Sequence, residues 1–466
     1  MKITNDIKIA HNKLSNASAG FLEFAQRNPD ALKRSSFNLL EGKDEVGRLQ
    51  SWPTFINQYT KNEMEKAAVS VFNVMKKIPK RIFANDPYKI SDYYEIPPDI
   101  AKIQLEGVRV DDRHIDNILA RGDFIFSPAG LKCLEYNVSV MIGGLQVAYW
   151  EPMYTGIPVI AKFLQEYRMK ILNKNLLAIL LEHIVENALE KFSHNETEIN
   201  IALVIPKYGR GFDKLTENKY LNQIYENILQ LKHKANGWKG KIIFCDYNHL
   251  NTADDYLFYR NKRIHVLMEM YHGVVPQQIW KVFKSGNICL YNGPITKLMS
   301  SKLNLALLSQ HEASEIFSPE EREIIKKYIP WTRKTIAGEV TYGTDNVKLE
   351  EFVFSHKERL VLKPCMGISG AGIHIGKNTP SAQWEKIVNK AFKEKNWLVQ
   401  EYIESLSFLY QRGEAGCTEH IVAWGFFVFG SRYGGAWARV LPAENKYGVI
   451  NSIQGAEESV VIEIAE

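Results

Sequence analysis

The sequence predicts a mixed α/β fold divided among more than one domain. Helical patterns dominate residues 1–110, as in KNEMEKAAVSVFNVMKKI, and strand-like runs begin near residue 120. From residue 195 to about 295, strand-like INIALVIP and KIIFCDY alternate with helical YLNQIYENILQLKHK, an order typical of small α/β units. A chain of 466 residues that is 45% hydrophobic can bury the cores of two to four domains.

Charge and apolar patterning exclude two classes of partner. Lys and Arg total 58 against 53 Asp and Glu, and the formal charge of +5 is a weak bias without any polybasic tract. We therefore expect no nucleic acid partner. The N-terminal MKITNDIKIAHNKLSN lacks the apolar segment of a secretory signal, and no run of about 18 apolar residues could cross a bilayer. Neither export nor membrane insertion is expected.

The cysteines and histidines predict neither a disulfide framework nor a zinc site. The five cysteines are scattered without a CxxC pair, and the twelve histidines contain no HExxH spacing. Such usage is typical of free thiols in a reducing compartment. We expect a cytoplasmic protein.

Two further segments complete the secondary-structure prediction. The run PVIAKFLQEYRMKILNKNLLAILLEHIVENALEKF carries apolar residues at helical spacing and predicts one or two long packed helices. The aromatic run VAYWEPMY just before it is interpreted as a strand in the core. A polar boundary, SHNETEI, begins at Ser193 and separates these helices from the α/β segment.

A hairpin is predicted in RGDFIFSPAGLKCLEYN. Pro128 suits the second position of a type I turn, and Gly130 suits the left-handed residue that follows such a turn. Together they predict a three-residue loop with a bulge, in which Ser127 faces Leu131. This register determines which polar side chains on the two strands share a face.

Counting outward from that loop, Asp123 faces Glu135 and Arg121 faces Asn137. Directly opposite side chains lie on one face of a sheet, so the four polar groups should gather there. Two facing carboxylates repel unless a cation lies between them, and Mg²⁺ is the natural occupant because it prefers oxygen ligands. The alternative is an exposed hairpin in which Arg121 merely neutralises Asp123.

A second candidate site is the glycine loop in RLVLKPCMGISGAGIHIGK. An apolar strand ends at Lys363, and Gly367, Ser369, Gly370 and Gly372 follow in a short loop before a second strand. Glycines let backbone N–H groups approach phosphate oxygens, and the lysine supplies a positive charge. The loop lacks the Walker and GxSxG patterns and leads into a strand, unlike a Rossmann turn. It indicates a cover over nucleotide phosphates or, alternatively, only a mobile hairpin tip.

The segment NWLVQEYIES is a candidate border for an adenine ring. Its strand ends with Gln400, Glu401 and Ile403, which offer polar backbone groups and an apolar wall. Any edge strand followed by an acidic loop would look similar. The segment therefore indicates an adenine site only in combination with the hairpin and the glycine loop.

Taken together, these motifs resemble the ATP-grasp superfamily, with a lysine, a glycine loop, QEYI as a hinge and ExN for magnesium. Here EYN precedes the glycine loop by more than two hundred residues, an order similar to the circularly permuted group that includes glutathionylspermidine synthetase. The spacing from Arg121 to Asp123 and on to LEYN is also similar to that group. The resemblance covers about residues 115–460, and residues 1–110 show no counterpart of the amidase domain fused in the bifunctional enzymes.

The resemblance implies a circularly permuted ATP-grasp fold with a helical N-terminal region and an inserted small α/β domain. We expect four parts: a helical region (1–110), the metal-binding part with long helices (111–194), a small α/β domain on the substrate side (195–295) and the nucleotide-binding part (296–466).

The resemblance also implies an ATP-dependent carboxylate–amine ligase that works through an acyl phosphate. Mg²⁺ would bind Asp123, Glu135 and Asn137, whereas Lys302, Lys363, the glycine loop and Gln400, Glu401 and Ile403 would bind ATP. Arg121 and Arg439, the latter in GSRYGGAWARV, would stabilise the carboxylate under attack and the oxyanion that follows. Alternatively, Lys302 is an exposed helix lysine and Arg439 belongs to a surface ion pair.

The substrates are expected to differ from those of the resembling family. After EYN the family continues with an aspartate and hydroxyl residues that help to hold its peptide substrate, whereas this chain continues VSVMIGG. We therefore expect another small-molecule or peptide carboxylate and another amine in place of glutathione and spermidine. A small-molecule kinase and a nucleotide-binding scaffold without turnover are the alternative functions, and family resemblance favours a homodimer.

Overall fold

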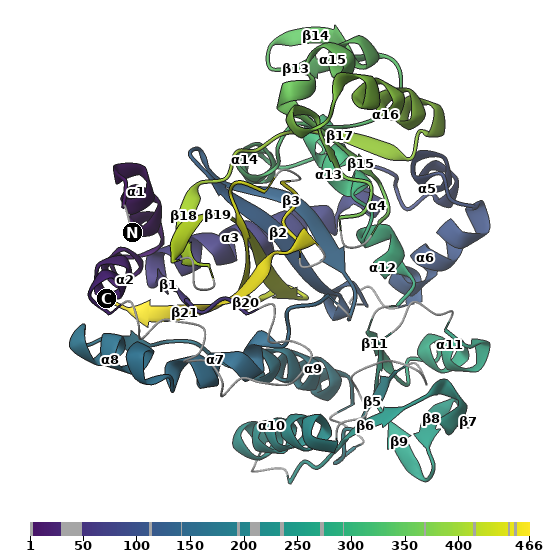
Figure 1. The fold of residues 1–466 in the computed structure, drawn as a ribbon. Coiled ribbons are helices and arrows are strands. Elements are labelled where there is room, and N and C mark those ends of the chain that lie inside the picture. Colours follow the sequence, from purple (N-terminus) through teal and green to yellow (C-terminus); the bar gives the residue numbers. More distant parts are fainter. Residues whose placement is uncertain are drawn as a thin grey trace.

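The chain is built around a large central sheet, with a parallel sheet and a smaller antiparallel sheet beside it (Figure 1). The computed structural model describes residues 3–28, 49–110, 114–140, 142–192, 196–205, 215–233, 237–270, 275–291, 293–367, 370–412, 416–445, 448–451 and 454–466. The mixed α/β class expected from the sequence is confirmed.

The central sheet has eight strands, with β1, β21, β20, β19, β2 and β3 in order and with β18 and β4 paired at its margins. Their bounds are β1 (Thr54–Asn57), β2 (Leu119–Ser127), β3 (Gly130–Val138), β4 (Lys170–Ile171), β18 (Ser407–Gln411), β19 (Cys417–Phe429), β20 (Arg432–Pro442) and β21 (Glu457–Ala465). The central strand β19 contains the apolar run IVAWGFFVF, and nearly all of that run is buried. Helix α3 (Gln58–Met75) packs against β19 and neighbouring strands and covers one face of the sheet (Figure 1).

Of the N-terminal helices, α1 and α2 pack against β1 and β18 of this sheet, and α6 packs against α5 and α12 (Ile295–Met299). Helices α1 and α2 are capped by the side chains of Thr4 and Ser15, which accept hydrogen bonds from backbone N–H groups in the first turn. The Glu466 carboxylate accepts a hydrogen bond from Ala17 N at 2.6 Å, which holds the C-terminus against α2. The bounds are α1 (Asn5–Leu14), α2 (Asn16–Arg27), α4 (Ile78–Arg81), α5 (Pro87–Tyr94), α6 (Pro98–Val110) and η4 (His114–Asn117).

The segment after β3 is helical, which corrects one prediction. VAYWEPMY lies in α7 (Val147–Thr155) and not in a strand, and Pro152 is accommodated inside that helix. The helical prediction that followed is confirmed, because the long apolar run forms α8 (Pro158–Glu166) and α9 (Leu176–Phe192). Short aromatic runs are ambiguous between strand and buried helix, and packing against the sheet decided this one.

The alternating segment after residue 195 forms a four-stranded parallel sheet in the order β11, β10, β5 and β6. Parallel strands need crossover connections, and α10 and α11 belong to this unit. A small three-stranded sheet, β7–β8–β9, packs beside it (Figure 1). The bounds are β5 (Ile201–Val204), α10 (Leu215–His233), β6 (Ile242–Cys245), η6 (Tyr247–His249), β7 (Leu250–Ala253), β8 (Tyr256–Tyr259), β9 (Lys262–Ile264), β10 (Val266–Glu269), α11 (Gln277–Lys284) and β11 (Cys289–Tyr291).

The C-terminal third adds a four-stranded antiparallel sheet in the order β12, β17, β15 and β16. Helices α15 and α16 cover it, and Trp384 of α16 packs with the buried Leu360, Leu362 and Val399 of the sheet. The bounds are α12 (Ile295–Met299), α13 (Leu303–Gln310), α14 (Pro319–Tyr328), β12 (Thr332–Lys334), β13 (Glu339–Tyr342), β14 (Asp345–Lys348), α15 (Leu349–Ser355), η7 (Lys357–Arg359), β15 (Leu360–Pro364), β16 (His374–Ile375), η8 (Gly376–Asn378), α16 (Ser381–Glu394) and β17 (Trp397–Glu401).

Two global expectations can be compared with the structure. All five cysteines are free thiols, as the sequence indicated. Within the described residues, no helix combines the length and the apolar character that crossing a membrane requires.

Candidate functional site

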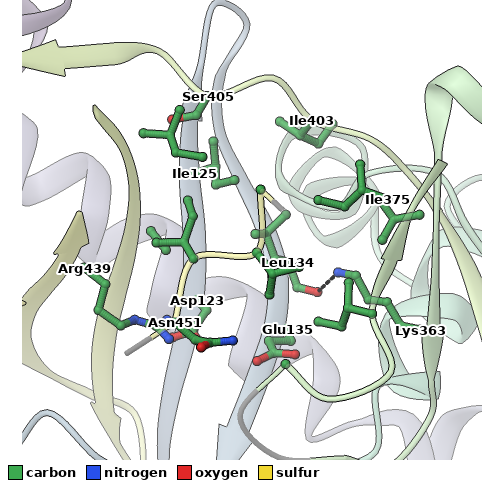
Figure 2. Close-up of a pocket in the computed structure, with 18 of the residues that line it drawn as sticks. Asp123, Ile125, Leu134, Glu135, Lys363, Ile375, Ile403, Ser405, Arg439 and Asn451 are labelled. Carbon is green, nitrogen blue, oxygen red and sulfur yellow. Dashed lines mark hydrogen bonds and ion pairs between the residues drawn. The ribbon is translucent and has the colours of Figure 1, made fainter. Parts of the chain in front are cut away.

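A cavity of about 530 Å³ lies between the central sheet and the antiparallel sheet. Figure 2 shows its two ends: Ile125, Ile375 and Ile403 gather at one end, and the charged side chains of Asp123 and Glu135 lie at the other. Such a cavity can hold an amphipathic ligand whose ring packs at the apolar end and whose charges lie at the polar end.

The β2–β3 hairpin supplies the charged end, although its turn differs from the prediction. Ser127 pairs with Gly130, not with Leu131, so the loop has two residues and not three. The extra residue lies further along β3, where a bulge at Leu134 shifts the register between Asp123 and Phe124.

The bulge restores the predicted pairs, so that Asp123 faces Glu135 and Arg121 faces Asn137. All four side chains line the cavity. Arg121 and Asp123 are only 6% and 3% exposed, so the alternative of an exposed hairpin with surface charges is wrong.

Asp123 is surrounded by hydrogen-bond donors. Arg121 donates from Nε to Oδ1 at 2.7 Å and from a terminal nitrogen to Oδ2 at 3.1 Å. Arg439 of β20 donates to the same Oδ2 at 2.7 Å, and Asn137 Nδ2 does so at 3.1 Å. Arg439 therefore belongs to a buried ion pair, and the alternative of a surface ion pair is wrong.

Glu135 lies beside this group and is paired with a lysine from another part of the chain. Lys302, the residue before α13, places Nζ 3.3 Å from Glu135 Oε2. The Asn137 amide nitrogen also reaches Glu135 Oε1 at 3.4 Å, so a single amide contacts both carboxylates. Lys302 is 9% exposed, which rules out an exposed helix lysine.

These neighbours set the ionisation of both acids. Burial would raise the pKa of Asp123, but the guanidinium groups of Arg121 and Arg439 outweigh it and bring the pKa to about 2. Burial likewise opposes ionisation of Glu135, yet Lys302 and Lys363 keep its pKa below the usual value. Both carboxylates are ionised at neutral pH.

Lys363 enters the cavity from β15. It is 5% exposed and donates to Gln400 Oε1 at 2.6 Å and to the Leu134 carbonyl at 3.4 Å, the latter drawn in Figure 2. Burial lowers the pKa of Lys363 to about 8, although Glu135 opposes this shift. The lysine is thus held by neutral groups and keeps donor capacity for an anion.

The glycine loop borders the same region. The Gly367 carbonyl accepts a hydrogen bond from Lys302 Nζ at 3.2 Å. Gly370 and Gly372 both have positive φ, and a Cβ at Gly370 would lie 2.5 Å from Asn451 Nδ2. Gly370 lines the cavity, whereas Gly367 and Gly372 are not among its lining residues, and the predicted Ser369 lies outside the described residues.

The apolar end is bordered by the last residues of β17 and by those that follow it. Gln400, Glu401 and Ile403 all line the cavity, as the adenine prediction requires. Gln400 is fixed because it accepts from Lys363 and donates to Thr332 Oγ1 at 3.1 Å.

Several lining residues were not predicted from the sequence, among them Ile142, Trp437 and Asn451. Trp437 lies two positions before Arg439 on β20, so strand alternation could have placed both side chains on one face. Asn451 lies between β20 and β21, in a segment whose sequence carries no ligand-binding pattern.

The donor set fits a magnesium ion that is shared with phosphates. Asp123, Glu135 and Asn137 offer carboxylate and amide oxygens from two adjacent strands of one cavity. Mg²⁺ usually binds one or two carboxylates together with substrate phosphates, and does not require a cage made only of protein ligands. Within the described part of the chain, no cluster of three or more His, Cys, Asp or Glu residues forms a metal site of its own.

Comparisons with known proteins support the fold. No family model and no curated protein matches the sequence. A glutathione synthetase-like effector from Globodera pallida, solved in its apo form, aligns over 98% of both chains with a TM-score of 0.58 and 12% identity. A provisionally assigned gamma-glutamylcysteine synthetase from Methylobacillus flagellatus covers 77% of this chain and 85% of its own, with 11% identity and a TM-score of 0.39, too low to support an argument. The chain therefore shares the fold of the glutathione synthetase-like effector over nearly its whole length.

Proposed function

We propose that the chain is an ATP-dependent carboxylate–amine ligase with a circularly permuted ATP-grasp fold, similar to the synthetase domain of glutathionylspermidine synthetase. The observation that supports this best is that Asp123, Glu135 and Lys363 line one cavity whose other end is apolar. Glu135 precedes Lys363 by more than two hundred residues, in agreement with a permuted order.

ATP would lie with its adenine against Gln400, Glu401 and Ile403. Lys302 and Lys363, whose charges both act on Glu135, would contact the phosphates, and the loop from Gly367 to Gly372 would cover them. Mg²⁺ held by Asp123, Glu135 and Asn137 would neutralise charge on the transferred phosphoryl group.

The reaction would take place in two steps. A carboxylate oxygen of the acid attacks the γ-phosphorus, and the bond from that phosphorus to the bridging oxygen breaks, which releases ADP. The amine nitrogen then attacks the acyl carbon, the bond from carbon to the phosphate oxygen breaks, and the surplus proton on nitrogen passes to solvent. The products are an amide and inorganic phosphate.

Arg121 and Arg439 would contribute differently to this reaction. Arg121 uses Nε and one terminal nitrogen on Asp123, and its other terminal nitrogen donates to the carbonyls of Ile142 and Gly143. Arg439 donates to Asp123 from one terminal nitrogen, and its Nε has no hydrogen-bond partner among the described residues. Arg439 thus has more capacity to stabilise a substrate carboxylate or an oxyanion.

Closure over the cavity would protect the acyl phosphate from water. Gly370 packs against Val449 and Asn451, and these three residues line one wall of the cavity. Excluding water limits hydrolysis of a reactive intermediate.

The test is ADP release from ATP and Mg²⁺ across panels of acids and amines. A ligase releases ADP and forms amide only when both an acid and an amine are present. A stable phosphorylated product that forms without any amine would identify a kinase instead. ATP binding without any turnover would point to the nucleotide-binding scaffold. The absence of ATP binding in a calorimetric titration with Mg²⁺ would contradict both enzyme functions.

A further inference from the structure

The indole ring of Trp437 lies beneath both arginines of the charged end. The guanidinium carbon of Arg121 is 4.8 Å from the ring centroid, and that of Arg439 is also 4.8 Å from it. A guanidinium at this distance from an aromatic face is attracted by the ring quadrupole, most strongly where water is excluded. Trp437 is 5% exposed, so the contact is well shielded.

The sheet is built to allow this arrangement. Asp123 of β2 faces Gly425 of β19, and Gly425 in turn faces Trp437 of β20, so the three lie in one row across the sheet. A Cβ on Gly425 would lie 2.7 Å from Arg121 Cδ and 3.1 Å from the Trp437 ring. The glycine therefore leaves the space through which Arg121 reaches the indole.

A second glycine also lies close to the ring. Gly144 has φ +83°, and a Cβ there would lie 2.6 Å from the Trp437 ring. The preceding carbonyls of Ile142 and Gly143 accept hydrogen bonds from Arg121. The tryptophan, Arg121 and the 142–144 segment thus form one packed unit.

The charges around Asp123 explain the role of the Trp437 ring, which we call the platform. Two guanidinium groups converge on a single oxygen of Asp123, with donor distances of 3.1 Å from Arg121 and 2.7 Å from Arg439. Like charges this close repel, and one carboxylate neutralises only one of them. The aromatic face attracts both cations without neutralising either, so that positive charge remains available to an anion.

We propose that Trp437 is a positioning residue that keeps the Arg439 guanidinium directed at the acyl group of the acid substrate. This inference rests on the proposed ligase function. Orientation of a catalytic group matters because a small displacement from its productive geometry costs a large part of the rate.

The experiment compares Trp437→Leu and Trp437→Phe with the wild-type chain, with hydroxylamine as the amine so that each activated acid yields a hydroxamate. Trp437→Leu should lower kcat/KM for the acid by roughly tenfold or more, and Trp437→Phe should recover most of that loss because it keeps an aromatic face. The affinity for ATP, measured by calorimetry, should change less than twofold in both.

The matched control is Trp331→Leu. Trp331 also lies under an arginine, with the Arg333 guanidinium carbon 5.0 Å from its ring, but it does not line the cavity. Its replacement should leave kcat/KM for the acid unchanged. An equal loss in both tryptophan variants would assign the effect to general stability and overturn the proposal.

A double-mutant cycle tests whether Trp437 acts through Arg439. In an Arg439→Lys background, Trp437→Leu should lower kcat/KM for the acid by less than threefold, because the guanidinium group that Trp437 positions is already replaced. Fully additive losses would contradict the proposal, as would failure of Trp437→Phe to restore activity.

A spectroscopic readout separates this inference from the proposed function. The ring current of Trp437 should shift the Nε–H proton resonances of Arg121 and Arg439, and Trp437→Leu should remove both shifts. If no acid yields a hydroxamate, the ligase proposal fails while the platform is still judged by these resonances. Unchanged resonances in Trp437→Leu would show that the platform does not exist.

Discussion

The two sides of the cavity handle charge in opposite ways. On the central sheet, Asp123 is enclosed by two arginines and an amide, and the two guanidinium groups hold its pKa at about 2 against the effect of burial. On the antiparallel sheet, Lys363 is buried against neutral groups, and burial lowers its pKa to about 8.

The difference indicates that the charges on the central sheet are arranged before a ligand binds, and we call this the preset side. The charge on the antiparallel sheet changes its environment when a ligand binds, and we call this the responding side. Paired charges on strands of one sheet are fixed by that sheet before any ligand binds, which is the condition for electrostatic preorganisation. A buried lysine whose hydrogen bonds go only to neutral groups gains from an incoming anion. We infer that, in the proposed ligase, the central sheet would orient the reacting groups and the antiparallel sheet would bind the nucleotide phosphates.

The strongest way to break the preset side is Glu135→Gln. The substitution keeps the size of the side chain but removes the charge that faces Asp123 and pairs with Lys302. We expect kcat to fall by about a hundredfold or more, the usual size of losing one electrostatic group in an active site. The melting temperature should change little.

Glu404→Gln is the matched control for that variant. Glu404 is an exposed carboxylate that pairs with Lys377 at 3.4 Å outside the cavity lining. Its turnover should equal that of the wild type, and a Glu135→Gln variant with full turnover would refute the assignment of the metal ligands.

The responding side can be examined through pH. The charged form of Lys363 attracts phosphate, and with a pKa of about 8 in the free protein it loses its proton as the pH rises through 8. ATP affinity should therefore be highest below pH 7 and fall by up to about tenfold per pH unit above 8, because binding must then take up a proton. Calorimetry in buffers of different ionisation enthalpy measures that uptake. Lys363→Met should bind more weakly and show no such slope, and an identical slope would contradict the assignment.

The packing of the preset side is tested by Gly425→Ala. The added methyl group would collide with Arg121 Cδ and the Trp437 ring, so the arginine must move. We expect a loss of about 1–3 kcal/mol in the free energy of unfolding, typical of overpacking, together with reduced turnover. Gly156→Ala is the control, because a Cβ at Gly156 meets Met153 O only at 3.5 Å, an ordinary contact. Equal denaturation midpoints for the two variants would argue against the close packing around Arg121.

The smallest effect is expected at the solvent-exposed ion pair between Lys377 and Glu404, which we call the rim. Lys377 pairs with Glu404 at 3.4 Å, and its side chain is 33% exposed. Solvent screens such pairs, so Lys377→Ala should change the free energy of unfolding by less than about 0.5 kcal/mol. A larger loss in chemical denaturation would mean that the rim, and not only the cavity, carries electrostatic stability.

The hairpin shows how much of the site the sequence could predict. The facing pairs were correct although the loop was wrong, because the pairing of Asp123 with Glu135 depends only on the presence of one extra residue between them. That residue lies at the Leu134 bulge and not in the turn. Local turn preferences could not locate it, since bulges depend on how the whole sheet twists.

Other parts of the site depend on tertiary packing. The ion pair between Lys302 and Glu135 joins segments more than 150 residues apart, and sequence alone gave only their resemblance to known motifs. Asn451 reaches the cavity because its segment packs against Gly370, a contact that leaves no local pattern. The helix at VAYWEPMY was missed for the same reason, since a short aromatic run fits a buried helix or a strand.

The most direct test is a crystal structure with Mg²⁺ and a non-hydrolysable ATP analogue. We predict that the triphosphate lies between Glu135 and Lys363, the adenine against Gln400 and Ile403, and the metal on the β2–β3 hairpin. An analogue bound outside this cavity, or inside it with the phosphates turned towards Ile125 and Ile403, would contradict the proposed function.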